Sequence, residues 1–267
     1  MNTTITRRDG PAGRFYEIDG VLYPSVTHIL SAAPKPALIH WAANEERKLV
    51  SEAAADLYAD IGRAGVPQLP RAAYLATLHA RLGPTKAHLK ARDHAADIGS
   101  GAHRLIEWAM RTAIGADAGP KPIVSNASLW AFMAFEDWAK SVCLKPVLIE
   151  RTVYSTMHGF AGTLDVLARV NGVLTHIDFK TGKAVYAEAH LQSAAYQTAL
   201  IEMGYLPPAG GGLIVRLPKV ESDPAFEVVA VPEAATLLPV FLAMKAVWAW
   251  MYQQDEAYRQ RRARKAS

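Results

Sequence analysis

Two strand-like segments joined by an Asn-Gly turn constrain this chain more than any other feature. Residues 162–170 and 173–180 are rich in strand-forming residues, and Asn171-Gly172 between them is typical of a tight type I′ hairpin turn. We therefore expect two antiparallel neighbouring strands. Asp165 and Asp178 lie equally far from the centre of this turn, so we expect them to be close cross-strand neighbours.

Helical patterns dominate the sequence before this hairpin, and strands alternate with helices after it. The expected helices are a short one ending at Leu30, then 37–58, 71–81, 84–114, 128–141, 187–203 and 232–259. The other expected strands are 15–18 and 21–23 around Asp19-Gly20, then 147–154, 212–217 and 226–231. This order predicts an α/β or α+β fold, with a mixed sheet flanked by helices and an N-terminal helical cap.

The chain of 267 residues is near the upper limit for a single hydrophobic core. We expect one domain, 1–267, made of a hairpin and helical cap (1–94), a catalytic core (95–231) and a C-terminal helix with a basic tail (232–267). Its 51% hydrophobic and 20% charged residues are typical of a globular protein, and a net charge of +4 permits binding to a polyanion.

The cysteine content and the hydropathy limit the kinds of metal site and the cellular location that we expect. The single cysteine, Cys143, excludes an intramolecular disulfide, and it cannot supply a cysteine-ligated zinc or iron–sulfur site alone. The N-terminus lacks the apolar segment of a signal peptide, and we expect no membrane span. The expectation is a cytoplasmic protein.

The residues best suited to catalysis are Asp165, Asp178 and Lys180. Side chains alternate along a strand, so Asp178 and Lys180 point to the same side. Two carboxylates suit Mg²⁺ or Mn²⁺, which lowers the pKa of a bound water, and the lysine can stabilise charge on a phosphate. The alternative is a solvated strand face, but both aspartates have apolar neighbours along their strands.

These segments resemble the PD-(D/E)XK nuclease superfamily, and within it the RecB-like and phage-type exonuclease branch. The matching pieces are Gly162-Thr163-Leu164-Asp165, Ile177-Asp178-Phe179-Lys180-Thr181-Gly182-Lys183, Gln192-Ser193-Ala194-Ala195-Tyr196 and, upstream, Gly101-Ala102-His103-Arg104-Leu105-Ile106-Glu107. The chain departs from the formal pattern at Leu164, where the signature has proline. The resemblance implies a restriction-endonuclease-like core and hydrolysis of a DNA phosphodiester.

The resemblance also assigns roles to residues. It implies that four groups hold Mg²⁺ or Mn²⁺: His103, Asp165, Asp178 and the Phe179 carbonyl. Without the resemblance, His103 would be interpreted as an ordinary helical histidine. Lys180, Gln192 and Tyr196 complete the expected catalytic set, although Gln192 and Tyr196 can equally be helix surface. Glu107 and Glu150 are weaker candidates that support the metal ligands from behind.

The expected substrate and partner is DNA. Lys183 can contact phosphate or be a plain loop lysine, while Lys86, Lys90 and Arg92 are better candidates for a DNA-facing rim. The basic tail, residues 259–265, either adds salt-sensitive contacts or is a solvated helix end. A helical arch that demands a free end favours an exonuclease of recombination, repair or phage DNA processing. The partners considered are a single-strand annealing protein or another recombination protein. The sequence leaves the oligomeric state open.

Other functions are less compatible with the sequence. No G-x-x-x-x-G-K-[ST] motif occurs, which disfavours a Walker-type motor. A different phosphoesterase would need a further cluster of His and Asp ligands. A DNA-binding scaffold without activity has no evident need for Asp165, Asp178 and Lys180 together.

Overall fold

A computed structural model describes residues 3–65, 69–205, 207–220, 222–223 and 225–266, with side chains described as far as Ala257. Within these residues the chain divides into two compact units. Unit 1 comprises residues up to Ala33 together with those from Ile98 onward, and unit 2 is Pro34–Asp97. The division into units leaves the expectation of one domain a prediction.

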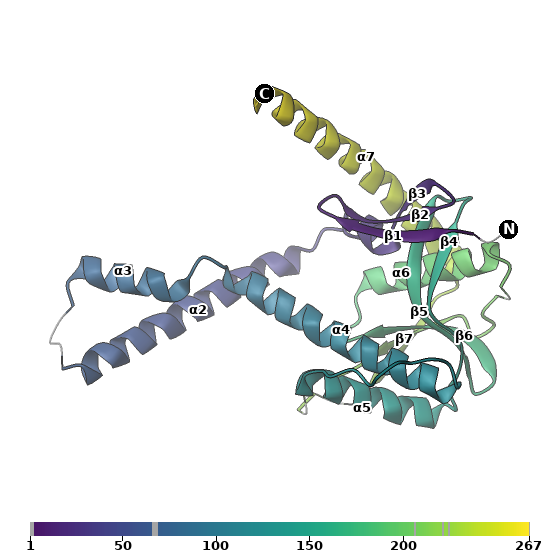
Figure 1. Ribbon diagram of the computed structural model, residues 1–267, viewed down its shortest axis with the longest axis horizontal. Coiled ribbons are helices and arrows are strands. Elements are labelled where there is room, and N and C mark those ends of the chain that lie inside the picture. Colours follow the sequence, from purple (N-terminus) through teal and green to yellow (C-terminus); the bar gives the residue numbers. More distant parts are fainter. Residues whose placement is uncertain (1–2, 66–68, 206, 221, 224, 267) are drawn as a thin grey trace. The chain divides into compact units, whose positions relative to one another are not determined.

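Unit 1 is built on a mixed sheet that, in the described part of the chain, has five strands in the order β4-β5-β6-β7-β8 (Figure 1). The strands are β4 (Lys145–Ser155), β5 (Phe160–Val170), β6 (Val173–Lys180), β7 (Gly212–Arg216) and β8 (Glu227–Val231). β6 and β7 are parallel and joined by helix α6 (Ala187–Glu202), and the other neighbours are antiparallel. The mixed sheet with flanking helices confirms the predicted fold class.

The predicted central hairpin is confirmed. Asn171 and Gly172 have φ values of 49° and 87°, as a type I′ turn requires at both central positions. The β5–β6 ladder runs from Val170–Val173 outward to Val166–Ile177. Continuing the same register places Asp165 opposite Asp178.

Helices cover the two faces of the sheet with separate apolar clusters. On one face, α4 (Ala87–Ala113) and α5 (Asn126–Ser141) pack on Val166, Ile177 and Phe179. On the other, α1 (Val26–Leu30), α6 and α7 (Ala234–Ala266) pack around residues such as Phe160 and Leu167. Because β6 alternates, Asp178 and Lys180 face α6 while Phe179 faces α4 and α5.

The N-terminal hairpin is confirmed as β2 (Gly13–Ile18) and β3 (Val21–Pro24), but the sequence did not reveal β1 (Ile5–Gly10). β1 is almost wholly exposed and polar, so it carries no apolar alternation that predicts a strand. Ser25 caps α1, accepting a hydrogen bond from the His28 amide at 3.0 Å.

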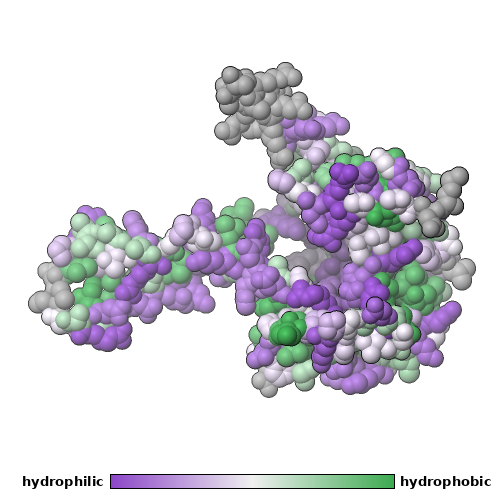
Figure 2. Space-filling view, in the orientation of Figure 1, coloured by the Kyte–Doolittle hydropathy of each residue, from purple (hydrophilic) through white to green (hydrophobic). Residues whose placement is uncertain are grey.

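Unit 2 contains α2 (Pro36–Arg63), α3 (Arg71–Leu82) and the start of α4, and provides the helices that the sequence predicted for the N-terminal cap. Within the described residues it buries Ala53 and Leu57, while apolar side chains reach its surface (Figure 2). Polar contacts join its helices: Glu46 lies 2.8 Å from His88, and Asp60 pairs with Arg81 at 2.5 Å. α4 begins at Ala87 rather than Pro84, so the predicted start was three residues early.

The C-terminal helix α7 contains a long apolar stretch. Among the described residues, one helical segment, Ala234–Ala257, is long and apolar enough to cross a membrane by length and composition. Lys245 is the only charged residue between Ala234 and Gln254. The expectation of no membrane span stays a prediction. Phe241 and Trp248 are buried in the cluster with α1 and α6. The backbone of the basic tail belongs to α7, but its side chains lie outside the described residues.

Candidate active site

The site begins where strands β5 and β6 stop pairing. Beyond Val166–Ile177 no further ladder pair forms, and the side chain of Asp165 takes its place: the Phe179 amide donates to Asp165 Oδ2 at 2.7 Å. Where the two strands stop pairing, side chains from helices on both faces of the sheet reach Asp165 and Asp178. His103 approaches from α4 and Gln192 from α6.

Asp178 and Lys180 form an ion pair in which the carboxylate is buried and the lysine is partly exposed. Lys180 Nζ lies 2.6 Å from Asp178 Oδ2, and the aspartate side chain is only 1% exposed. Burial raises the pKa of Asp178, opposed by the charge of Lys180. Burial alone would lower the pKa of Lys180, but the Asp178 and Asp165 carboxylates outweigh it and the pKa is raised. Lys180 therefore remains an ammonium ion at neutral pH.

Gln192 bridges this pair. Its Nε2 donates to Asp178 Oδ1 at 3.1 Å, and its Oε1 accepts from Lys180 Nζ at 3.1 Å. The amide therefore fixes both partners at once. Tyr196, one turn later, is buried, with its hydroxyl 3.5 Å from Gln192 Nε2. Burial raises the pKa of the Tyr196 phenol well above its usual value, so it stays neutral behind Gln192.

Gly162 has a steric role in this arrangement. A Cβ atom at this position would lie 2.5 Å from Cε1 and 2.8 Å from the hydroxyl of Tyr196. Only glycine permits this approach of α6 to β5. The spacing of Gly162 and Asp165 thus combines a packing requirement with a functional carboxylate.

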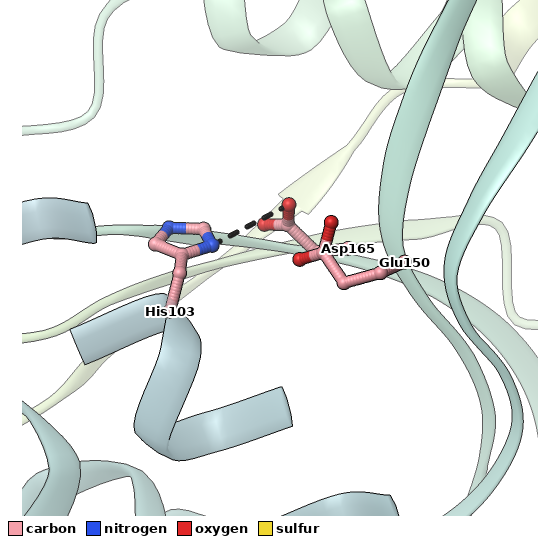
Figure 3. A group of neighbouring side chains, drawn as sticks. All are labelled: His103, Glu150 and Asp165. Atoms are coloured by element: carbon pink, nitrogen blue, oxygen red, sulfur yellow. Dashed lines mark ion pairs between the residues drawn. The ribbon is translucent and has the colours of Figure 1, made fainter. Parts of the chain in front are cut away.

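The two ring nitrogens of His103 face different groups. Its Nε2 lies 3.1 Å from the Phe179 carbonyl oxygen, which can only accept, so Nε2 carries the proton. Nδ1 then faces Asp165 Oδ1 at 3.6 Å (Figure 3). The atom of His103 best placed for a metal is therefore Nδ1, and the Phe179 carbonyl serves as its hydrogen-bond acceptor. A metal contact by that carbonyl stays a prediction.

Glu150 joins His103 and Asp165. Ligand atoms of the three residues lie within 4.8 Å of one another, and the three side chains converge in Figure 3. Glu150 has a φ of 46°, a left-handed conformation that is strained for a non-glycine residue inside a strand. Burial and the neighbouring Asp165 and Glu107 carboxylates raise the pKa of Glu150 to about 8. The fold therefore holds a half-buried acid in a costly conformation beside the predicted ligands.

The remaining residues predicted from the sequence are Glu107 and four basic candidates for DNA contact. Glu107 accepts from Arg111 Nε at 2.8 Å, one turn along α4. The strongest DNA-contact candidates from the sequence are all exposed; these are Lys183, after β6, and Lys86, Lys90 and Arg92 in unit 2. Arg92 pairs with Asp93 at 2.8 Å. Their contacts with DNA stay predictions.

Sequence reasoning missed two buried groups next to the site. His176, on the same face of β6 as Asp178, is fully buried with Nδ1 2.9 Å from Ser193 Oγ, and burial lowers its pKa to about 4. Arg216, at the end of β7, is buried beside Lys180. Neither sits in a recognisable motif, and only their alternation with apolar residues hints at an inward-facing side chain.

The fold and these side chains together have the arrangement expected of a metal-dependent nuclease. Residues 70–264 match the PD-(D/E)XK nuclease superfamily, which is more than half of the chain. The chain therefore belongs to the PD-(D/E)XK nuclease superfamily, and the resemblance drawn from its motifs is confirmed at that level.

Solved structures add only distant similarity. An alkaline exonuclease (LHK-Exo) from Laribacter hongkongensis has 14% identity and a TM-score of 0.37, with 65% of this chain and 97% of that chain covered. The same enzyme in complex with dAMP gives 13% identity and a TM-score of 0.35 at the same coverage. No curated protein matches. These likenesses are too weak to carry an activity to this chain.

Proposed function

We propose that this protein is a divalent-metal-dependent deoxyribonuclease that hydrolyses DNA phosphodiesters, acting as an exonuclease. The observation that carries the proposal is the convergence of two aspartates and a lysine at the end of the β5–β6 ladder. Asp178 and Lys180 are held together by Gln192, and Asp165 lies beside His103 and Glu150. A scaffold that only binds DNA has no need to bury such a costly group of charges.

The donor set fits Mg²⁺ or Mn²⁺. Asp165 and Glu150 offer carboxylate oxygens and His103 offers a single nitrogen, a set that hard divalent cations accept and that lacks thiolates for softer metals. Asp178 is the fourth proposed ligand. When bound, the cation lowers the pKa of water and neutralises negative charge that develops on the phosphate.

The residues of the chain divide the remaining work. Lys180, kept charged by its carboxylate neighbours, is proposed to stabilise the phosphate oxygens in the transition state. Gln192 holds Lys180 and Asp178 at a fixed separation, and Tyr196 supports Gln192 from behind. Preorganised groups of this kind need little rearrangement during reaction, which lowers the barrier.

DNA is the proposed substrate, with four exposed basic residues as phosphate contacts: Lys183, Lys86, Lys90 and Arg92. Such contacts weaken as salt rises, because binding releases counterions. Recombination, repair or phage DNA processing is the proposed setting, in the cytoplasm of a bacterium or of an infected host. A recombination protein that anneals single strands is the proposed kind of protein partner.

The test compares wild type with Asp178→Asn and Lys180→Gln on end-labelled linear and closed circular DNA, with Mg²⁺, Mn²⁺ or EDTA. Matched controls are Asp137→Asn and Lys140→Gln, which change exposed residues of α5. Metal-dependent loss of linear DNA by wild type and both controls, but not by the site variants, supports the exonuclease. Cutting of the circle would instead assign an endonuclease. No cleavage by a folded wild type that binds DNA would leave a binding protein with a nuclease fold.

A further inference from the structure

Arg216 is a buried cation with partners on three segments of the chain. Its side chain is 6% exposed. Its guanidinium pairs with Asp223 Oδ2 at 2.9 Å and Glu227 Oε2 at 3.1 Å, and it donates to the carbonyls of Gly182 at 3.2 Å and Ala225 at 3.4 Å. A buried guanidinium is stable only when its donors are satisfied, and here each of its three nitrogens donates to at least one acceptor.

The contact with Gly182 brings Arg216 to the proposed active site. The parallel register of β6 and β7 pairs Lys180 with Arg216, and the Leu217 amide donates to the Lys180 carbonyl at 2.8 Å. Gly182 follows two residues after Lys180, in the connection that leads to α6 and Gln192. Arg216 therefore holds the connection that runs from Lys180 to Gln192, the two residues that contact Asp178.

The charge of Arg216 is balanced by carboxylates other than Asp178. Asp223 and Glu227 pair with the guanidinium, while Asp178 pairs with Lys180 at 2.6 Å. Lys180, and not Arg216, is therefore the cation that pairs with Asp178.

We propose that Arg216 is a positioning residue of the nuclease reaction, which fixes the 181–186 connection and thereby the approach of Lys180 and Gln192 to Asp178. This inference rests on the proposed function. Asp223 and Glu227 satisfy the charge of Arg216, and the bond to Gly182 adds a link to a segment 34 residues away in the sequence. That link is the one the proposal requires.

Arg216→Lys is the informative variant, because lysine keeps the charge but lacks the planar fork that reaches several acceptors at once. Arg169→Lys is the matched control, since it makes the same change at an exposed arginine of β5 that bonds to Gly172 rather than to the partners of Arg216. Three quantities are measured: kcat and KM on linear DNA, the melting temperature, and hydrogen–deuterium exchange of residues 181–191 without metal.

We expect Arg216→Lys to speed exchange across 181–186 and to lower kcat roughly 10- to 100-fold, as small misplacements of reacting groups do, with KM near wild type. Lysine makes fewer of these buried bonds, so the melting temperature should also fall, and kcat is measured well below it and per folded protein. Arg169→Lys should change neither exchange across 181–186 nor kcat. Unchanged exchange in Arg216→Lys would overturn the proposal, as would a fall in kcat that disappears once it is corrected for the fraction of folded protein. If wild type cleaves no DNA, the function fails, while the exchange data still decide whether Arg216 holds the connection.

Discussion

Replacing Glu150 with glutamine removes one charge from the site while keeping the size of the side chain. In the metal-free protein, burial and the Asp165 and Glu107 carboxylates raise the pKa of Glu150 to about 8, against 4.5 ordinarily. Each pKa unit corresponds to ~1.4 kcal/mol of preference for the protonated form. Ionised Glu150 therefore opposes folding by a few kcal/mol when no cation is bound.

The sign of the pH dependence follows from proton binding. Between pH 4.5 and about 8, folded protein retains the Glu150 proton that the unfolded chain releases. The contribution of this group to stability therefore falls as pH rises through that window and levels off above it. Glutamine cannot ionise, so Glu150→Gln escapes the loss.

Thermal unfolding in EDTA measures this difference. For a chain of this size ~1 kcal/mol shifts the melting temperature by roughly 2–4 °C, so a difference of ~4 kcal/mol should make the advantage of Glu150→Gln over wild type grow by about 8–15 °C between pH 5 and pH 8.5. Glu233→Gln, which changes an exposed carboxylate just before α7, serves as the control and should follow wild type.

Metal binding should show the opposite preference. A cation needs the ionised carboxylate, so the wild-type affinity for Mg²⁺ or Mn²⁺ should rise by up to about tenfold per pH unit below pH 8. By calorimetry, Glu150→Gln should bind roughly 10- to 100-fold more weakly at pH 8, in line with the loss of a ligand-supporting group. Wild-type affinity and wild-type pH dependence in this variant would refute the assignment of Glu150 to the site.

Two further substitutions probe the support of the site. Gly162→Ala places a methyl group 2.5 Å from the Tyr196 ring, so denaturant unfolding should show a loss of ~1–3 kcal/mol. Trimming the ring with Tyr196→Leu in the same chain should recover part of it, and equal, additive losses would contradict the steric reason. Gln192→Ala removes the bridge between Asp178 and Lys180. We expect steady-state kinetics to show kcat lowered roughly 10- to 100-fold with DNA affinity retained; an unchanged kcat would show that the bridge is dispensable.

Local sequence patterns were sufficient for the central hairpin and its register. The Asn171-Gly172 turn specifies the pairing of β5 and β6, because a type I′ turn fixes which residues face each other. The placement of Asp165 opposite Asp178 follows from that register alone. Helix α6 and the shared face of Gln192 and Tyr196 were likewise predictable, since spacing along a helix determines which side chains share a face. The place of Gln192 at the site was implied only by the family resemblance.

Contacts between segments far apart in the sequence needed the tertiary structure. The convergence of Glu150 on His103 depends on a left-handed residue inside β4, and a glutamate in a strand gives no sequence signal for that conformation. Arg216 reaches Gly182 only because β6 and β7 pair in parallel.

The sequence by itself determined most of the elements, though not β1, together with the central register and the identity of the two aspartates and the lysine, because these depend on turn chemistry and side-chain periodicity. Only the tertiary structure decided which nitrogen of His103 faces Asp165, that Tyr196 is buried behind Gln192, and that Glu150 carries a raised pKa. The physical reason is that hydrogen-bond direction and desolvation depend on the distances between packed elements, which periodicity does not contain.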